Sequence, residues 1–437
     1  MSVSDPGRGG RIVVVGAAMA GLRTAEQLRS AGWKGSVLLL GEEQHAPYNR
    51  PPLSKEVLAL PEVPDDVLEP VRLRQRSSAA GVEFRLGERA VASDLIGRTV
   101  TLASGESIPY DGLVIATGLR PRRLSVPGPS SGRYVVRTID DALRLRERLS
   151  SGTKVAVIGC GFIGCEVAAT AFDLGCEVEL VEGGNGPMHH ALGSTVSAAM
   201  RDWLLRRGVR IHTGQVVEEL LAEAESASEL GSEPEPPESG RDDGGAVAGV
   251  RLDSGVEIDA EVVVEAIGSH PNIEWLQGNG LDLTDGVLTD ERLRVVGAEA
   301  VVAAGDIARF AGPWTAGVPL RVEHWQNAVD TAKTAARALT AQLTGAEQPQ
   351  PHAAVPSFWS EIFGVRIQGL GAPHSGTRSV VLEGSLEAVE DGVCVAYDRD
   401  GILIGVVTVG LPPAHILRFR EHLGRLLTDL TAAVPGP

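Results

Sequence analysis

The N-terminal part of the chain alternates between short apolar runs and an amphipathic stretch. Residues 11–16 read RIVVVG, and residues 17–32, AAMAGLRTAEQLRSAG, repeat small and apolar residues at helical spacing. A second apolar run, SVLLLG, follows at residues 36–41. Because short apolar runs bounded by glycine are typical of buried parallel strands, this order predicts a strand, a helix and a second strand that begin a βαβ unit.

The same pattern occurs a second time at residues 154–182, KVAVIGCGFIGCEVAATAFDLGCEVELVE. This stretch contains an apolar run, a glycine-rich turn, a run of small residues, a further apolar run and a closing acid. The chain therefore carries two copies of one dinucleotide-binding unit. We expect an α/β fold with two Rossmann-like dinucleotide-binding domains.

The later part of the chain contains further strand and helix patterns. Apolar runs that end in a glycine turn recur at residues 113–118, 262–268 and 301–305, and residues 321–343 predict a helix. From about residue 346, short β-like runs such as VCVAYD and ILIGVVTVG precede one helix expected at residues 413–427. This change of pattern predicts a C-terminal α+β domain.

Composition and charge limit the classes of function. The chain has 437 residues, of which 43% are hydrophobic and 22% charged, and this predicts two or three globular domains. The formal net charge of −17 argues against nucleic acid or an anionic membrane as the main partner. Residues 222–245 are acidic and rich in Pro, Gly and Ser, which predicts a disordered surface insertion. The N-terminus lacks the apolar core of a signal peptide, and the apolar runs are too short to span a membrane, so we expect a cytoplasmic protein.

The chain has four cysteines, Cys160, Cys165, Cys176 and Cys394, too few for a secreted disulfide scaffold of this length. Cys160 and Cys165 have the C-x4-C spacing of a redox pair. Both, however, fall in the second glycine loop and at the start of its helix, where small residues are favoured. Packing is therefore the favoured interpretation of the pair, and no metal site is expected.

The first glycine loop reads Gly16-Ala17-Ala18-Met19-Ala20-Gly21. Gly16 makes the tight turn, and Gly21 allows the helix to pack closely on the strand. Ala18 stands where a middle glycine would let the backbone approach a pyrophosphate, and its one methyl group requires the loop to lie slightly further back. Glu42, at the end of the second strand, is placed to accept hydrogen bonds from a ribose.

The second glycine loop is complete, with Gly159, Gly161 and Gly164. Its closing acid is Glu182, whose carboxylate binds ribose hydroxyls and repels a 2′-phosphate, so NAD is favoured over NADP. A single such loop is also compatible with an ordinary glycine turn. Two copies, each followed by a helix, a strand and an acid, favour two nucleotide cofactors.

Motifs along nearly the whole chain resemble those of the FAD-dependent, NAD(P)H-using ferredoxin reductases that serve cytochromes P450 and Rieske oxygenases, the putidaredoxin-reductase type. RPPLSK and FWS are fairly specific to this group, whereas the glycine motifs are shared with other flavoproteins that bind two dinucleotides. The motifs that carry the resemblance are YNRPPLSK (48–55), IATGLRPR (115–122), VVRTIDDA (135–142), VIGCGFIGCEVAA (157–169), IGSHPN (267–272), AAGDIARF (303–310), VEHWQNA (322–328) and FWSEIFGVRIQ (358–368).

The resemblance implies a particular domain order. Residues 1–122 and 263–343 would form an FAD domain in two segments, residues 123–262 an inserted NAD domain, and residues 344–437 the C-terminal domain. One departure from the family pattern is Glu361-Ile362-Phe363, which replaces the more usual Asp-Gln-Tyr after FWS. This departure leaves the identity of the partner open.

The resemblance also implies the roles of single residues. Lys55 would lie by the reactive edge of the flavin and pair with Glu166, and these two are the expected catalytic residues. Arg50 would face the pyrophosphate. Further FAD contacts are expected from Gly16, Ala20, Gly21, Glu42, Ala90, Arg137, Asp306 and Trp325. The nicotinamide dinucleotide is expected at Gly159, Gly161, Gly164 and Glu182. Thr117, Gly118, Ile163, Gly268, Gly305 and Glu323 are expected cofactor contacts that are not assigned to one of the two.

The expected function is an NADH:ferredoxin reductase, in which FAD takes a hydride from NADH and releases electrons singly to a ferredoxin with a [2Fe–2S] or similar cluster. That ferredoxin would supply an oxygenase. A disulfide reductase needs cysteines in the first domain, and the chain has no cysteine before Cys160. Two alternatives stay open at this point: an NADH-dependent reductase or oxidase of a small molecule, and an FAD-bound interaction or signalling protein.

Overall fold

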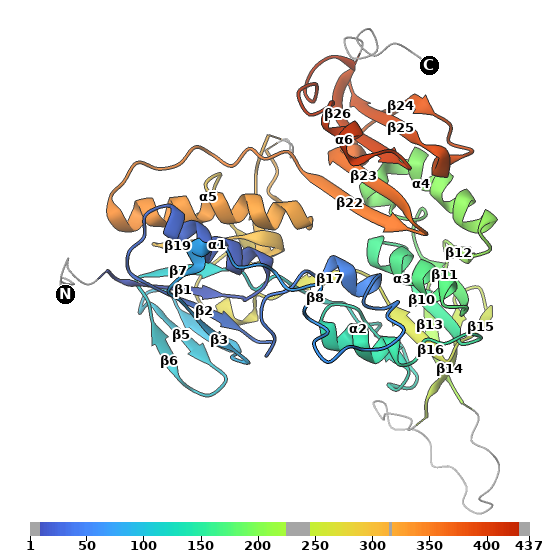
Figure 1. The fold of residues 1–437 in the computed structure, drawn as a ribbon, viewed down its shortest axis with the longest axis horizontal. Coiled ribbons are helices and arrows are strands. Elements are labelled where there is room, and N and C mark those ends of the chain that lie inside the picture. The colour runs from blue at the N-terminus through green and yellow to red at the C-terminus, as the bar shows by residue number, and fades with distance from the viewer. Residues whose placement is uncertain (1–8, 224–244, 314–316, 428–437) are drawn as a thin grey trace, which may run out of the picture. The chain divides into compact units, whose positions relative to one another are not determined.

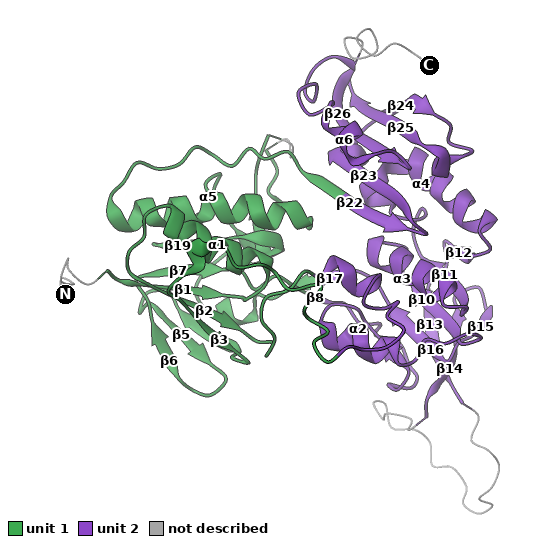
Figure 2. Cartoon of the chain, in the orientation of Figure 1, with its two compact units in different colours: residues 1–49, 65–120, 270–358 green, residues 50–64, 121–269, 359–437 purple. Residues whose placement is uncertain are grey.

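The computed structural model describes residues 9–223, 245–313 and 317–427. They fall into two compact units (Figure 1, Figure 2). Unit 1 comprises residues 1–49, 65–120 and 270–358, and unit 2 comprises residues 50–64, 121–269 and 359–437. The insertion expected at residues 222–245 lies almost wholly outside the described residues. The domain limits expected after residues 122, 262 and 343 stay predictions.

Unit 1 is built on a parallel sheet with the strand order β19-β7-β1-β2-β3. Its central strand is β1, where Val13 aligns with Leu38 on one side and Leu113 on the other. All three side chains are buried, which is why these strands read as continuous apolar runs. Helices α1 (Met19–Ser30) and α5 (Trp325–Thr344) pack against each other and against this sheet. The strands are β1 (Arg11–Val15), β2 (Ser36–Gly41), β3 (Val82–Leu86), β7 (Gly112–Ile115) and β19 (Val301–Ala303).

Two smaller sheets complete unit 1. One is antiparallel and contains β4 (Ala90–Asp94), β5 (Thr99–Leu102) and β6 (Ser107–Pro109). The other contains β18 (Val287–Leu288), β20 (Ala308–Phe310) and β21 (Leu320–Arg321). The chain passes between the two units after residues 49, 64, 120, 269 and 358, and the passages after residues 120 and 269 fall in β8 (Leu119–Pro121) and β17 (Ser269–Pro271).

Unit 2 contains a second parallel sheet, with the order β12-β11-β10-β16-β9. It repeats the arrangement of unit 1, because a glycine turn and helix α3 (Phe162–Asp173) join two buried parallel strands. Unit 2 also contains the helices α2 (Ile139–Arg146) and α4 (His189–Arg206). The strands are β9 (Arg133–Tyr134), β10 (Lys154–Ile158), β11 (Glu177–Glu182), β12 (Arg210–Thr213) and β16 (Val262–Glu265), with an antiparallel sheet of β13 (Val217–Ala222), β14 (Val247–Leu252) and β15 (Glu257–Asp259).

The C-terminal part of the chain forms a sheet with the order β22-β23-β26-β25-β24. It packs on the helices of unit 2: the Phe363 ring meets Phe172 of α3 and Trp203 of α4 edge-on, with centroids 5.7 and 5.9 Å apart. This packing places the β22–β23 turn beside α3. The strands are β22 (Ser357–Ile362), β23 (Val365–Gly371), β24 (Arg378–Gly384), β25 (Val393–Arg399) and β26 (Ile402–Val409).

The prediction of a helix over residues 413–427 is wrong in its length. Only α6 (Pro413–Leu417) is a regular helix, and turns follow it. Beyond α6 the backbone N–H groups of Gly424 and Leu427 donate to the carbonyls of Leu403 and Gly401, both at 2.8 Å. These donors therefore bond to the β26 region, and the helical hydrogen-bond pattern stops.

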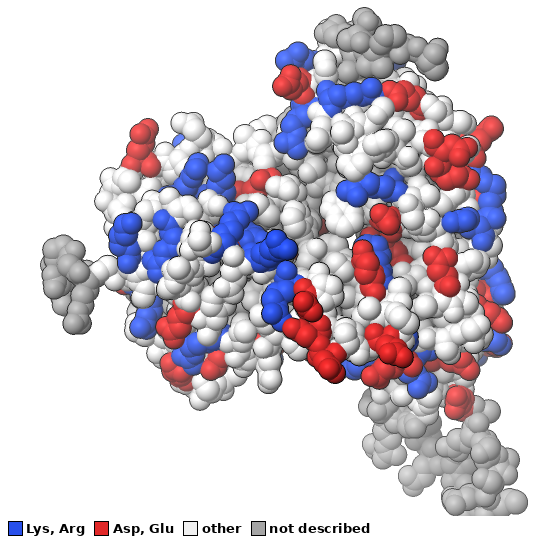
Figure 3. Space-filling view, viewed as in Figure 1, with Lys and Arg blue, Asp and Glu red and all other residues white. Residues whose placement is uncertain are grey.

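Charge is unevenly distributed on the molecule. Figure 3 shows Lys and Arg side chains gathered over helices α1 and α5 of unit 1. Arg72, Arg74 and Arg76 are exposed in the same unit, and Arg72 forms an ion pair of 2.7 Å with Asp66. The formal net charge of −17 therefore does not describe this face of unit 1.

None of the described helices is long and apolar enough to cross a bilayer.

Candidate cofactor sites

The first glycine loop connects β1 to α1 in unit 1. Gly16 has φ +114°, and a Cβ there would lie 2.1 Å from the carbonyl oxygen of Ala116. A Cβ on Gly21 would lie 1.8 Å from the carbonyl oxygen of Gly16. Ala18 caps the helix with φ −96° and extended backbone, a conformation that any L-residue adopts without strain. The two outer glycines are thus required by close contacts, whereas the middle position accepts alanine.

The first turn of α1 is suited to an anion. The helix has no side-chain cap and no acidic residue in its first turn, so its terminal N–H groups keep their hydrogen-bonding capacity. Gly305 packs directly on this turn, because a Cβ on it would lie 2.7 Å from the Cβ of Ala20. The amide of Gly305 donates to the Thr331 hydroxyl of α5 at 2.9 Å. The loop, Ala20, Gly305 and the adjoining Asp306 are therefore brought together, as a dinucleotide pyrophosphate requires.

The remaining expected cofactor residues of unit 1 are spread around it. Thr117 and Asn272 exchange two hydrogen bonds, of 2.8 and 3.0 Å, and Gly118 follows with φ +62°. Trp325 begins α5, is 39% exposed, and donates from its indole nitrogen to the side chain of Asn49 at 2.6 Å. Three further positions have the following contacts: Glu42 is exposed with Arg89 at 3.6 Å, Ala90 pairs with Leu102, and Glu323 accepts from Arg321 at 2.7 Å.

The second glycine loop connects β10 to α3 in unit 2. Gly159 has φ +101°, and a Cβ there would lie 2.4 Å from the carbonyl oxygen of Ala266. A Cβ on Gly164 would lie 1.9 Å from the carbonyl oxygen of Gly159. A Cβ on Gly161 would meet no atom within 4 Å. The loop is therefore tight at both ends and open in the middle, which fits the approach of a pyrophosphate to the helix N-terminus.

Glu182, at the end of β11, is held over this loop by backbone donors. Its Oε2 accepts from the amide of Cys160 at 2.9 Å, and its Oε1 accepts from the amide of Gly184 at 2.7 Å. The carboxylate is thereby oriented at the loop where the ribose of a bound dinucleotide is expected. Ile163 is 42% exposed on the first turn of α3, and Gly268, with φ +96°, accepts from the amide of Arg122 at 2.9 Å.

The two cysteines of this loop are both buried, and the Cys165 thiol donates to the Cys160 carbonyl at 3.4 Å. The contact with the Cys160 side chain, together with burial, raises the pKa of Cys165 well above its ordinary value. A reactive thiol needs a lowered pKa and solvent access, so this pair is suited to packing. No group of residues in the described part of the chain has the arrangement of a metal site.

Lys55 and Glu166 form a buried ion pair in unit 2. Lys55 follows the 3-10 turn Pro51–Ser54, and its Nζ lies 2.7 Å from Oε2 of Glu166 on α3. The contact has the distance of an ion pair but not the angle of a directed hydrogen bond. The ammonium also lies 5.6 Å from the ring centroid of Trp359. The turn itself is fixed to α3, because the Thr170 hydroxyl donates to the Ser54 carbonyl at 2.9 Å.

Two residues of this site were not predicted as site residues. The Ser54 hydroxyl donates to Oε2 of Glu166 at 2.5 Å, and the Ser360 hydroxyl donates to Oε1 at 2.6 Å. Both serines lie inside motifs that carry the family resemblance, RPPLSK and FWS. A signal was therefore present, but it did not show which residue the hydroxyls bind.

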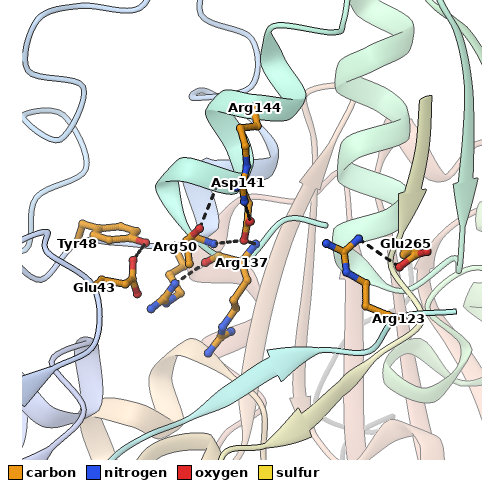
Figure 4. A network of polar contacts seen from close by, with 9 residues as sticks. Glu43, Tyr48, Arg50, Arg123, Arg137, Asp141, Arg144 and Glu265 are labelled. Carbon is orange, nitrogen blue, oxygen red and sulfur yellow. Dashed lines mark hydrogen bonds and ion pairs between the residues drawn. The ribbon is translucent and has the colours of Figure 1, made fainter. Parts of the chain in front are cut away.

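Arg50 and Arg137 are also brought together in unit 2. Nη1 of Arg50 donates to the carbonyl of Arg137, just before α2. The helix starts with a capping box formed by Thr138 and Asp141, and Asp141 also pairs with Arg144 at 2.6 Å. Figure 4 shows the guanidinium groups of Arg50 and Arg137 extending away from α2. Two separate contacts appear in the same view: Glu43 with Tyr48 at 2.5 Å, and Arg123 with the buried Glu265 at 3.4 Å.

Two parallel sheets, each with a glycine loop that leads into an uncapped helix, define a protein that binds two dinucleotides. The chain belongs to the pyridine nucleotide-disulphide oxidoreductase family, whose model matches residues 10–332.

Curated relatives and solved structures agree with this family. The chain is 36% identical to rhodocoxin reductase from Rhodococcus erythropolis over 407 residues, which cover 93% of this chain and 87% of that protein. It is 35% identical over 373 residues to the ferredoxin–NAD(+) reductase component of the p-cumate 2,3-dioxygenase system from Pseudomonas putida, covering 85% of this chain and 83% of that protein. The crystal structure of the ferredoxin reductase for the CYP199A2 system from Rhodopseudomonas palustris superposes with a TM-score of 0.81 at 31% identity, covering 97% of this chain and 100% of that chain.

These similarities confirm the predicted family, the α/β fold class and the oxidoreductase class. They also confirm FAD and NADH as the cofactors. The roles of the individual site residues stay predictions. When bound, FAD supplies acceptance of a hydride and release of single electrons.

Proposed function

We propose that this chain is an NADH-dependent ferredoxin reductase of the cytoplasm. It takes electrons from NADH and passes them singly to an iron–sulfur ferredoxin, which supplies an oxygenase. The similarity to ferredoxin reductases of oxygenase systems over most of both chains supports this function.

The observation that carries the proposal is the ion pair between Lys55, which follows the proline turn after the first βαβ unit, and Glu166 on α3. A disulfide reductase of this family needs a cysteine pair in its first domain, and this chain has Pro51, Pro52 and Ser54 in that region. All four cysteines are buried and occur from Cys160 onward. The chain therefore has no cysteine pair in its first domain that could accept electrons from the flavin. In this proposal the acceptor is an external electron carrier.

The site residues are assigned to the two cofactors by the motif in which each of them lies. FAD is held through the first glycine loop, Asp306 and Trp325 of unit 1, and the family motifs add Arg50, Lys55 and Arg137. NADH is held through the second glycine loop, with Glu182 on its ribose. Lys55 provides a positive charge that favours an anionic reduced flavin, and Glu166 holds Lys55. In this proposal residues 1–122 and 263–343 form the FAD domain, residues 123–262 form the NAD domain, and residues 344–437 form the C-terminal domain.

Stopped-flow spectroscopy tests the proposal. NADH is expected to bleach the flavin absorbance faster than NADPH at equal concentration. Turnover is then measured with a panel of [2Fe–2S] ferredoxins and with rubredoxin. A flavin that NADH does not bleach would overturn the proposed function. Bleaching without reduction of any iron protein would instead favour an NADH-dependent reductase of a small molecule.

A further inference from the structure

The carboxylate of Glu166 has donors on both of its oxygens. The Lys55 ammonium lies 2.7 Å from Oε2, and the Ser54 hydroxyl donates to the same oxygen at 2.5 Å. The Ser360 hydroxyl donates to Oε1 at 2.6 Å. Glu166 is 6% exposed, Ser54 3% and Ser360 0%. Water therefore cannot replace either hydroxyl without a rearrangement of the surrounding side chains.

The three segments that meet at Glu166 are distant in the sequence. Ser54 ends the proline turn, Glu166 lies on α3, and Ser360 lies on β22 of the C-terminal sheet. Side chains alternate along β22, so that Ser360 is buried while its neighbours Trp359 and Glu361 are exposed. The strand thus directs one small donor inward to the free oxygen of Glu166.

An ion pair alone fixes the distance between two charges but leaves their orientation loose. The Lys55–Glu166 contact lacks hydrogen-bond alignment, and a carboxylate with one partner can rotate about its χ3 torsion. Hydroxyl donors to an ionised carboxylate are short and directional, and together they set the plane of the group. Among the described residues, no other side-chain donor to Oε1 of Glu166 is present.

We propose that Ser54 and Ser360 are positioning residues that fix the plane of the Glu166 carboxylate and, through it, the place of the Lys55 ammonium. The inference rests on the proposed function for the role of Lys55. It adds that the C-terminal sheet, through Ser360, sets the position of a charge that acts on the cofactor chemistry.

The test compares Ser360→Ala and Ser54→Ala with the matched control Ser197→Ala in the FAD-loaded protein. Ser197 is also fully buried in unit 2, and its hydroxyl has no hydrogen-bond partner among the described residues. The first readout is acetylation of Lys55 by acetic anhydride, followed by peptide mass spectrometry. We expect acetylation to be about tenfold faster in Ser360→Ala, the ratio that corresponds to loss of one hydrogen bond to a charged group. The control should label like the unsubstituted protein.

The second readout is the midpoint potential of the flavin. A looser Lys55 stabilises the reduced flavin less, so we expect the potential of Ser360→Ala to fall by about 30 mV, a tenfold change in the two-electron equilibrium. In a Glu166→Gln background the same serine substitution should change neither readout further, because the serine acts through the carboxylate.

Failure of this inference and failure of the proposed function give different results. If NADH does not reduce the flavin of the unsubstituted protein, the proposed function fails. If Lys55→Met lowers the potential but Ser360→Ala and Ser54→Ala match Ser197→Ala in both readouts, the positioning role is overturned. An effect of Ser360→Ala that persists in the Glu166→Gln background would also overturn it.

Discussion

The ammonium of Lys55 lies 2.7 Å from Oε2 of Glu166, and the two side chains are 12% and 8% exposed. The proline turn supplies the cation, and the first helix of the second dinucleotide unit supplies the anion. Since Glu166 lies only two residues after Gly164 of the second glycine loop, the helix whose N-terminus is proposed to bind NADH also holds the lysine. The turn and the loop are therefore parts of one arrangement within unit 2.

Lys55→Met should both destabilise the protein and slow its reduction by NADH. Removing one partner of a buried ion pair leaves an uncompensated charge, which costs about 3 kcal/mol of unfolding free energy. Urea denaturation measures that loss, and stopped-flow absorbance measures flavin reduction, expected to be at least about tenfold slower.

The double variant Lys55→Met with Glu166→Gln separates these two effects. The double change removes both charges, so most of the lost unfolding free energy should return, while flavin reduction should stay slow. If reduction recovers together with stability, Lys55 has only a structural role.

The glycine loops and parallel sheets could be predicted because their signals are local. A tight turn, a helix of small residues and buried strands each require particular residue types within a few positions. The serines on Glu166 could not be predicted in this way. Their hydrogen bonds join residues 112 and 194 positions apart, and nothing local in RPPLSK or FWS shows which acid each hydroxyl meets.

At the C-terminal helix, the local sequence pattern predicted more regular structure than the chain forms. Residues 413–427 have apolar residues at helical spacing, yet most of them form turns. Backbone hydrogen bonds from Gly424 and Leu427 to the β26 region compete with helix formation. The strand that accepts them lies outside the stretch whose apolar spacing predicted the helix. The predicted element type was correct only for α6.

Alanine at two positions of the second glycine loop should have opposite consequences. Gly161→Ala places a methyl group where no protein atom lies within 4 Å, so unfolding free energy should change by less than about 1 kcal/mol. The methyl group would occupy the space proposed for the pyrophosphate, so the KM for NADH should rise about tenfold. Steady-state kinetics and thermal unfolding test this variant.

Gly164→Ala is the matched comparison. Its Cβ would lie 1.9 Å from a backbone oxygen, so the variant should lose about 1–3 kcal/mol of unfolding free energy. Equal stability of both variants would contradict the packing assigned to the loop.

Substitution of Glu182 should relax the preference for NADH over NADPH. In Glu182→Gln the side chain keeps one acceptor for the amides of Cys160 and Gly184 but loses the charge that repels a 2′-phosphate. The ratio of kcat/KM for NADPH to that for NADH should increase about tenfold, or about 1.4 kcal/mol. An unchanged ratio would remove Glu182 from the ribose site.

His352 should make the stability of the protein depend on pH in a defined window. It is buried in unit 1, where its Nδ1 lies 3.1 Å from the Thr334 hydroxyl and its ring meets Phe310 edge-on. Burial lowers the pKa of His352 below its usual 6.5, although Asp330 opposes the shift. As the pH falls through about 6.5, the unfolded chain takes up this proton first, so the free energy of unfolding should decrease until the folded histidine is also protonated.

Urea denaturation between pH 7.5 and pH 5 measures this loss in the unsubstituted protein, in His352→Gln and in the control His270→Gln. His270 is an exposed histidine of the same unit, and its variant controls for the change from histidine to glutamine itself. His352→Gln cannot be protonated, and its curve should be flatter than the other two within the window. The comparison rests on slopes, and any constant loss of stability caused by the smaller glutamine side chain does not affect it. If the three curves run parallel, burial of His352 does not contribute to the acid sensitivity of unit 1.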